Sequence, residues 1–418
     1  MDIEKSIKDL AVAVKAAARV LAAAPTKEKD RALLAMAANL RRRRDFLQDR
    51  NRIDLDKAAA GGLSPAMIDR LTLSDQVIEA MATGLEEVAA FPDPIGEIVR
   101  MWRRPNQLQV GKMRIPLGVV GMIYESRPNV TADAAGLCLK SGNGVILRGG
   151  SEAFNSNMAV LEVLHEALED TAIPASVVQV VPFTDRQAIN YLLACEDEID
   201  LIIPRGGEGL IRFVVEHSRI PVIKHYKGVC HVYVDAGADQ EMATNIVINA
   251  KTHRPGVCNA AETVLVHQEL AAEFMPGLVT ALKTAGVEVR GCARTCALVE
   301  GLIPATDFDW GAEYLDLILA VKVVDDLDAA ITHIVKYGSD HTETIVTRDY
   351  QRAQEFLRRI NSSVVMVNAS TRFSDGGQMG LGAEIGISTT KLHAYGPMGL
   401  EGLTTTKYII YGNGQIRE

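Results

Sequence analysis

The sequence has few aromatic residues, few cysteines and no long apolar run. Aromatic residues make up 5% of the 418 residues, and the six cysteines are scattered along the chain. This usage excludes a small disulfide-stapled secreted domain and indicates reduced thiols. No run approaches the ~18 apolar residues of a membrane helix, and the opening MDIEKSIKDL lacks the apolar stretch of a secretory signal. We therefore expect a cytoplasmic protein that does not enter a membrane.

Positive charge is also in short supply. The 44 Lys and Arg residues are outnumbered by 53 Asp and Glu residues, which gives a net charge of −9. This balance disfavours nucleic-acid binding, because a phosphate backbone needs a positive surface. The one basic cluster, residues 41–44, is interpreted as a solvated helix face. With 48% hydrophobic and 23% charged residues, the chain is an ordinary globular protein, long enough for two or three domains.

The first part of the chain predicts helices followed by a β-ribbon. Apolar residues such as Ile7, Leu10 and Val14 recur at helical spacing through about residue 90. Residues 98–115 instead alternate between apolar and charged side chains, as in a two-stranded ribbon. A ribbon with charges on both faces cannot bury itself alone, so we expect it to protrude and to pack on another subunit.

From residue 116 the pattern is α/β. Apolar strands alternate with helical segments, which predicts a parallel sheet covered on both faces, with ligands at the carboxyl ends of its strands. The expected strands are 116–125, 144–150, 176–182, 199–207 and 220–225. A second α/β unit begins near residue 230, and residues 404–412 alternate like a final strand.

Two glycine-rich turns are candidates for binding a phosphorylated cofactor. Each follows a predicted strand and leads into a predicted helix, where backbone amides and the helix dipole favour phosphate. The candidate residues are Arg148, Gly149, Ser151, Gly206 and Gly207. Arg148, with no acid at the start of its turn, favours NADP over NAD, although nearby Glu152 weakens that inference. Two ordinary β–α turns remain an alternative of similar weight.

The segment KTHRPGVCN, residues 251–259, is the strongest candidate for catalysis. Lys251, His253 and Arg254 precede Cys258, and cations favour the nucleophilic thiolate over the thiol. Asn259 directly follows the cysteine and could supply a side-chain donor. The pattern predicts a nucleophilic cysteine, whereas most cysteines are inert small hydrophobes.

The remaining histidines and cysteines do not predict a metal site. His333 and His341 are eight residues apart and lack further ligands close in sequence, so we expect no metal there. His333 on an apolar helix face is interpreted as a packing residue. Cys292 and Cys296 are one helical turn apart and are interpreted as a chance pair, not as a zinc half-site.

Several segments together resemble the gamma-glutamyl phosphate reductase family, within the aldehyde dehydrogenase superfamily. They are PLGVVGMIYESRPNV, IDLIIPRGGEGLI, KTHRPGVCNAAETVLV and VDDLDAAITHIVKYGSDHTETI. The resemblance covers nearly the whole chain and implies an α/β aldehyde dehydrogenase-like fold with a β-ribbon for homo-oligomerisation. The implied parts are an NADP-binding domain (1–97 and 116–229, with a late return near 356–371), a catalytic domain (230–355), and an oligomerisation ribbon and tail (98–115 and 372–418).

The resemblance also implies a reaction. L-glutamyl 5-phosphate is reduced by NADPH to L-glutamate 5-semialdehyde with release of phosphate, the second step of proline biosynthesis, coupled in function to glutamate 5-kinase. Cys258 attacks the acyl phosphate to form a thioester, which then accepts hydride. Hydrolytic relatives carry a Glu-Leu-Gly-Gly stretch that activates water, whereas residues 225–228 here contain no acid. This absence favours reduction of an acyl phosphate over oxidation of an aldehyde.

Site residues follow by position from the same resemblance. Glu313 corresponds to the glutamate that holds the nicotinamide ribose, with Leu315 where the family motif has Phe, and Arg148 stands where the superfamily has a Lys toward the adenine ribose. The oxyanion donors are the backbone N–H of Cys258, Asn259 or Asn129. The substrate-binding candidates are Arg127, Lys227 and Arg254, each with a surface salt bridge as its alternative. A coenzyme A-dependent acylating aldehyde dehydrogenase and a non-catalytic scaffold remain the other interpretations, and the intact RPGVCN stretch disfavours the scaffold.

Overall fold

The computed structural model describes residues 2–417, which divide into two compact units. The first unit contains residues 2–224, 380–386 and 398–417. The second contains His225–Met379 and Ile387–Pro397. Within the described range, no helix is both long enough and apolar enough to cross a membrane.

The first unit begins with the expected helices. They are α1 (Ile3–Leu21), α2 (Thr26–Arg42), α3 (Arg44–Ala60), α4 (Pro65–Leu71) and α5 (Asp75–Ala90). Side chains of Asp2, Ser64 and Ser74 accept hydrogen bonds from backbone amides in the first turns of α1, α4 and α5, which stabilises these helix starts. The helical spacing read from the sequence is therefore confirmed.

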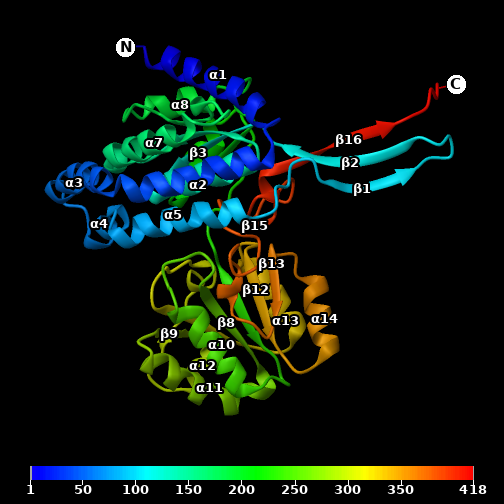
Figure 1. Ribbon diagram of the computed structural model, residues 1–418. Helices are drawn as coiled ribbons and strands as arrows, with labels where there is room; N and C mark the ends of the chain where they lie inside the picture. The colour runs from blue at the N-terminus through cyan, green and yellow to red at the C-terminus, as the bar shows by residue number, and fades with distance from the viewer. Residues whose placement is uncertain (1, 418) are drawn as a thin grey trace. The chain divides into compact units, whose positions relative to one another are not determined.

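A four-stranded parallel sheet in the order β5-β4-β3-β6 forms the centre of this unit (Figure 1). Its strands are β3 (Val119–Tyr124), β4 (Gly144–Arg148), β5 (Val178–Val180) and β6 (Leu201–Arg205). The helices between and after them are α6 (Asn129–Lys140), α7 (Phe154–Leu168), α8 (Gln187–Leu193) and α9 (Glu208–His217). On one face, Ile123 and Ile202 pack with residues of α1, α8 and α9. On the other, the Tyr124 hydroxyl bonds to the Thr131 hydroxyl of α6 at 2.6 Å.

The expected fifth strand at 220–225 is wrong. Only an isolated bridge joins Ile202 to Val222, beside the end of the four-stranded sheet. Pro221 has no backbone N–H to donate, and its carbonyl accepts from the Ile202 amide at 2.9 Å. The segment is apolar like a strand, but the proline limits its pairing to a single bridge.

The predicted ribbon is present and has a third strand. β1 (Ile98–Arg103) pairs antiparallel with β2 (Gln109–Pro116), and β2 pairs antiparallel with β16 (Thr404–Tyr411). The C-terminal strand expected at 404–412 is thus confirmed as part of this ribbon, which extends away from the helices of its unit (Figure 1). Its exposed large apolar residues are Ile98, Val99, Met101, Tyr408, Ile410 and Tyr411.

The second unit is built on a seven-stranded parallel sheet in the order β10-β9-β11-β8-β7-β12-β13. The strands are β7 (Cys230–Val234), β8 (Ala261–His267), β9 (Glu288–Gly291), β10 (Ile303–Pro304), β11 (Ile318–Val324), β12 (Thr342–Val346) and β13 (Val364–Val367). The helices are α10 (Gln240–Thr252), α11 (Gln268–Thr284), α12 (Ala293–Leu298), α13 (Leu327–Tyr337) and α14 (Tyr350–Arg359). Short elements complete the chain: η1 (Ser151–Ala153), η2 (Ala175–Val177), η3 (Asp309–Gly311), η4 (Thr371–Phe373), η5 (Glu401–Leu403), β14 (Gly386–Ser388) and β15 (Gly396–Met398).

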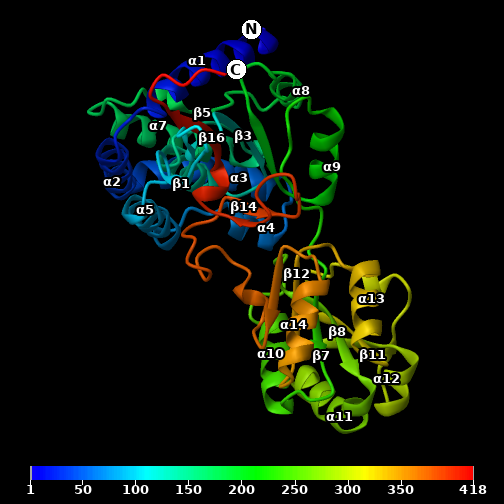
Figure 2. The ribbon, with the colours of Figure 1, turned by 90° about the vertical axis from the view of Figure 1, so that its right-hand side faces the viewer.

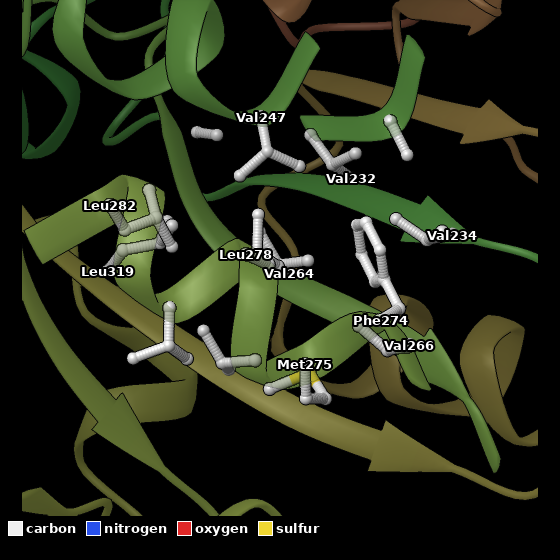
Figure 3. Close-up of a cluster of buried hydrophobic side chains, with 14 of the residues drawn as sticks. Val232, Val234, Val247, Val264, Val266, Phe274, Met275, Leu278, Leu282 and Leu319 are labelled. Carbon is white, nitrogen blue, oxygen red and sulfur yellow. The ribbon is translucent and has the colours of Figure 1, made fainter. Parts of the chain in front are cut away.

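Alternate residues of this sheet fill two separate cores. Val232 and Val264 point to one face and pack with α10 and with α11, including Phe274 and Leu278 (Figure 3). Tyr233 and its strand neighbours on the opposite face pack with α13 and α14 (Figure 2). A parallel sheet covered on both faces explains why the central strands β7, β8 and β12 are buried along their whole length.

Residues 356–371 differ from the expected late return to the cofactor-binding part. They contain the end of α14, strand β13 and the short η4, all within the second unit. β13 pairs in parallel with β12, from Thr342↔Val364 to Ile345↔Val367. The segment therefore extends the seven-stranded sheet, because its apolar residues complete the ladder at the edge next to β12.

Candidate active site

Cys258 lies in the loop that joins α10 to β8, at the amino end of that strand. Its side chain is half-buried, whereas Cys138, Cys195 and Cys230 are buried. Strands β8, β7 and β12 are neighbours and run parallel, so the segments that precede them reach the same edge of the sheet. These segments carry Cys258, Gly228 and His341. The candidate site is therefore at the amino edge of the second sheet.

Gly228 makes room for the Cys258 backbone. A Cβ atom at Gly228 would lie 1.9 Å from the Cys258 carbonyl oxygen, so only glycine fits there. The Gly228 N–H donates to Glu313 Oε1 at 2.8 Å. On the other side, the Cys230 thiol donates to the same Cys258 carbonyl at 3.1 Å. These contacts fix the backbone that carries the Cys258 sulfur.

The nearby cations differ in part from those expected. Lys251 is fully buried and forms a 2.6 Å ion pair with Glu262, so its charge is compensated inside the protein. Arg254 is exposed, as a substrate contact requires. Arg372, which the sequence analysis missed, donates to His253 Nδ1 at 3.2 Å and interacts electrostatically with Cys258. Burial lowers the pKa of Arg372, and no sequence signal links it to a cysteine so distant along the chain.

The two thiols at this edge have different surroundings. Burial raises the pKa of Cys230 well above its ordinary value, and the nearby carboxylate of Glu343 acts in the same direction. Cys230 therefore stays a protonated thiol and a hydrogen-bond donor. Cys258 is partly open to solvent and lies within the electrostatic influence of Arg372, a setting that favours a reactive thiolate.

Two histidines converge on Cys258. One nitrogen of His225, one nitrogen of His341 and the Cys258 sulfur all lie within 4.8 Å of one another. His341 is fully buried, and desolvation followed by the charge of His225 lowers its pKa to about 3. The sequence analysis gave neither histidine a role at the cysteine, because the three residues come from separate loops. His333, by contrast, is a packing residue as expected, with its ring against Trp310 and Tyr337.

Asn259 is engaged elsewhere. Its side-chain amide is buried and donates to the Ser374 carbonyl at 2.8 Å, and its own carbonyl accepts from Thr371 at 2.7 Å. The side chain therefore holds the 371–374 turn against the cysteine loop. This contact uses one of the two N–H bonds of the amide, and the role expected of Asn259 at a reacting oxygen stays a prediction.

Two further predicted residues have partners inside the second unit. Lys227 Nζ donates to the Gly311 carbonyl at 3.0 Å, and its side chain is half-buried. Glu313 uses one carboxylate oxygen to hold Gly228, as described above. Leu315 has a positive φ of 55° and is 47% exposed, so its side chain presents an apolar surface to solvent.

In the first unit, the two glycine-rich turns end β4 and β6. A Cβ atom at Gly149 would lie 2.1 Å from Asn157 Nδ2, and one at Gly206 would lie 2.6 Å from the Glu125 carboxylate. At both positions a larger residue would have to displace a neighbouring side chain. Gly207 is exposed, precedes α9 and has open space around the position of a Cβ atom, although its N–H donates to Glu125. Of these two turns, the one at the start of α9 offers the more open approach for a phosphate group.

Arg148 is largely buried at the carboxyl end of β4. Its two terminal nitrogens donate to the carbonyls of Gly149 and Thr184, at 2.9 and 3.2 Å. Its Nε is buried and has no hydrogen-bond partner among the described residues. Ser151 follows in an exposed position. The residues of this turn fit a dinucleotide cofactor through one unused donor and an exposed hydroxyl, while most of the guanidinium already holds the turn.

Asn129 begins α6 and pairs with the next turn of the helix. Its side-chain amide donates to Asp133 Oδ2 at 3.0 Å, which uses one of its two N–H bonds. Arg127 lies just before it and is half-buried. Burial raises the pKa of Asp133 to about 6, against the hydrogen bond from Asn129 and the charge of Arg205.

The raised pKa of Asp133 predicts a pH-dependent cost in stability. Because the folded state binds this proton more tightly than the unfolded chain, the free energy of unfolding should fall as pH rises from about 4 through 6. Asp133→Asn keeps an acceptor for Asn129 and should remove a cost on the order of 3 kcal/mol at pH 8. Urea unfolding of wild type and Asp133→Asn at pH 5 and pH 8 measures this difference in the free energy of unfolding. The exposed control Asp69→Asn should leave the pH dependence unchanged, and an equal slope in wild type and Asp133→Asn would contradict the argument.

Comparison with known proteins identifies the family. Residues 3–293 match the family model described as aldehyde dehydrogenase family. A gamma-glutamyl phosphate reductase from Desulfatibacillum aliphaticivorans is 61% identical over 417 residues, covering 100% of both chains. The chain belongs to the gamma-glutamyl phosphate reductases of the aldehyde dehydrogenase family. The family resemblance and the fold class expected from the sequence are both confirmed.

Solved structures agree with this family. The crystal structure of a gamma-glutamyl phosphate reductase from Thermotoga maritima has a TM-score of 0.97 and 47% identity, and covers 99% of this chain and 100% of its own. An acetylating aldehyde dehydrogenase from Geobacillus thermoglucosidasius has a TM-score of 0.70 at 16% identity, covering 100% of this chain and 98% of its own. The second likeness concerns the fold alone. The chain is an oxidoreductase that acts on an aldehyde group, and its fold is one that uses a nicotinamide cofactor.

Proposed function

We propose that the chain reduces L-glutamyl 5-phosphate with NADPH to L-glutamate 5-semialdehyde and phosphate, with Cys258 as nucleophile. The observation that carries the proposal is 61% identity, over the full length of both chains, to a gamma-glutamyl phosphate reductase. It is supported by the setting of Cys258, which is partly exposed, near Arg372, and held by its backbone to Gly228 and Cys230. A chain with this reaction takes part in proline biosynthesis.

Cys258 does the covalent chemistry. Its thiolate attacks the acyl carbon, the carbon–oxygen bond to phosphate breaks, and a thioester and inorganic phosphate result. After reduction, the carbon–sulfur bond breaks, the aldehyde leaves, and the thiolate is regenerated. The buried Cys230 does not compete, because its raised pKa keeps its proton on the sulfur. The backbone N–H of Cys258, with Asn129 or Asn259 as the second candidate donor, stabilises negative charge on the substrate oxygen.

The cofactor, when bound, supplies hydride to the thioester carbon. Arg148, Gly149 and Ser151 on the β4 turn, and Gly206 and Gly207 before α9, are the proposed cofactor-binding residues of the first unit. The unused Nε of Arg148 and the open start of α9 support this assignment. We propose that NADP is preferred over NAD because Arg148 binds the 2′-phosphate, and this preference depends on Arg148 alone.

Several side chains are proposed to orient the ligands. Glu313, proposed for the nicotinamide ribose, also holds Gly228, so it links cofactor binding to the backbone beside Cys258. Arg127, Lys227 and Arg254 remain the proposed partners of the substrate's phosphate and carboxylates. Arg372 joins this group because it already lies within electrostatic reach of the sulfur.

The three-stranded ribbon is proposed to serve self-association. β1 and β16 are its two edges, and they carry exposed residues such as Met101, Tyr408 and Ile410. Unpaired strand edges with apolar side chains are surfaces that a second copy covers readily.

An acyl phosphate hydrolyses readily in water, so we also propose functional coupling to the glutamate kinase reaction that supplies it.

The reverse reaction tests the proposed function. Purified protein with glutamate 5-semialdehyde, NADP and phosphate should form NADPH, followed by absorbance, at a rate that depends on phosphate. The same assay with coenzyme A in place of phosphate should show no comparable rate. A rate that needs coenzyme A and ignores phosphate would instead favour the acylating aldehyde dehydrogenase, whose present support is the fold likeness at 16% identity.

A further inference from the structure

Three side chains of metal-binding type meet at the amino edge of the second sheet. His225, Cys258 and His341 each offer one ligand atom, and these atoms lie within 4.8 Å of one another. They belong to one unit and precede the neighbouring strands β7, β8 and β12, so the sheet register itself brings them together. Thiolate and imidazole are the ligands that zinc and similar divalent ions prefer.

His225 has a fixed tautomer. Its Nδ1 lies 2.8 Å from the Ile387 carbonyl oxygen, which can only accept a hydrogen bond. Nδ1 therefore carries the proton, and in the neutral ring Nε2 keeps its lone pair. A backbone carbonyl that holds the far nitrogen is the usual support of a metal-binding histidine.

His341 is oriented in the same way by a chain of hydroxyl groups. Its Nδ1 lies 2.8 Å from Thr342 Oγ1, and that hydroxyl donates its own hydrogen to Ser374 Oγ at 2.9 Å. Thr342 must therefore accept from His341, which places the proton on Nδ1 and a lone pair on Nε2. Nε2 is buried without a hydrogen-bond partner in residues 2–417. A buried lone pair with no donor is unusual in a protein interior, and a cation would satisfy it.

We propose that His225, Cys258 and His341 bind a single divalent transition-metal ion, such as zinc, which reversibly blocks the enzyme by occupying the Cys258 sulfur. Binding forms a metal–sulfur bond and releases the thiol proton to solvent. A metal-bound sulfur cannot attack an acyl phosphate. Three protein ligands leave the fourth tetrahedral position for water.

The geometry is close to that of such a site. Zinc–ligand bonds of about 2.0–2.3 Å place tetrahedral ligand atoms roughly 3.5 Å apart, so the three atoms need to approach by about 1 Å. Cys258 is half-buried and provides the way in from solvent.

The pair Cys292 and Cys296 provides a matched control. Both are half-buried free thiols in the same unit, one helical turn apart. Their sulfurs already contact Thr295 and the Gly291 carbonyl, and within the described chain they do not join a group of three metal ligands. If the metal were bound by any half-buried cysteine, replacing Cys292 and Cys296 would reduce metal binding. The proposed ion at Cys258 should bind equally well after that replacement.

Cobalt titration of the metal-free, full-length protein tests the proposal. Wild type and the Cys292→Ser/Cys296→Ser control should each bind one Co²⁺ with a near-ultraviolet sulfur-to-cobalt band. Cys258→Ser should lose the band, and His341→Asn and His225→Asn should each weaken binding at least 10-fold. Thr342→Val, which removes only the support of His341, should weaken it about 10–100-fold. Zinc should inhibit the wild-type reaction and EDTA should restore it.

A second measurement needs no variant. Stoichiometric zinc should protect Cys258 of the wild-type protein from alkylation, read residue by residue by mass spectrometry, while Cys292 and Cys296 keep their reactivity. The proposal would be overturned if the cobalt band survived in Cys258→Ser, or if both histidine variants bound Co²⁺ with wild-type affinity. It would also be overturned if zinc left Cys258 as reactive toward alkylation as in the metal-free protein. Both readouts are binding measurements, so a failure of the proposed reaction leaves them interpretable.

Discussion

Replacing Cys258 with serine should remove nearly all reductase activity, a loss on the order of 10⁴-fold or more. The hydroxyl is a far weaker nucleophile than a thiolate, and it gives an ester that accepts hydride poorly compared with a thioester. The side chain is half-buried and close in size to the original, so the fold should persist. The measurement is phosphate-dependent NADPH formation, with urea unfolding to show that stability is retained.

The neighbouring thiol is the control for this prediction. Cys230 approaches the same backbone, and a serine there can still donate to the Cys258 carbonyl that the thiol now contacts at 3.1 Å. Cys230→Ser should keep activity within about 10-fold of wild type, because that sulfur holds its proton and takes no part in the chemistry. If Cys230→Ser were inactive and Cys258→Ser active, the nucleophile would be the buried thiol, and the proposed mechanism would fail.

Gly228→Ala is expected to damage the site without touching the sulfur. The new Cβ would lie 1.9 Å from the Cys258 carbonyl oxygen, a backbone atom that cannot rotate away. The two segments must separate, which also disturbs the hydrogen bond from Gly228 to Glu313. Displacement of a reacting group by about 1 Å can cost about 100-fold in rate, and overpacking costs about 1–3 kcal/mol in stability. Activity assays and urea unfolding measure the two effects.

Gly237→Ala is the matched substitution. Gly237 is in the same unit, its φ is not positive, and an added Cβ would meet nothing within 4 Å. It should change neither activity nor the free energy of unfolding by a measurable amount. Wild-type activity in Gly228→Ala would mean that the two loops are not in contact as described, and the account of how Cys258 is held would have to be abandoned.

Much of the fold was predictable because hydrophobic periodicity is a local property. The helices before residue 90 follow from apolar residues at helical spacing, the ribbon from alternation of apolar and charged residues, and most parallel strands from short apolar runs. The strand predicted at 220–225 is wrong because the segment is apolar enough for a strand, whereas Pro221 has no backbone N–H to donate to a neighbouring strand. β13 was placed in the wrong part because strand pairing depends on partners far away in sequence.

The candidate site was predictable only where one short segment carries the signal. Cys258 stands out in RPGVCN, and that prediction still awaits its test. Lys251 looked like an activating cation, but its side chain turns inward to Glu262, and Asn259 turns to the 371–374 turn. Arg372, His225 and His341 were not linked to the cysteine, because nothing within any one segment indicates their proximity.

The sequence by itself determined the family, the two α/β units, the ribbon and the candidate nucleophile Cys258. Motifs and hydrophobic periodicity can be recognised within short stretches of consecutive residues. Only the tertiary structure decided what surrounds that cysteine. The parallel register of β8, β7 and β12 brings three distant loops to one edge. Burial then fixes the protonation of Cys230 and His341, because desolvation depends on neighbours that no local pattern specifies.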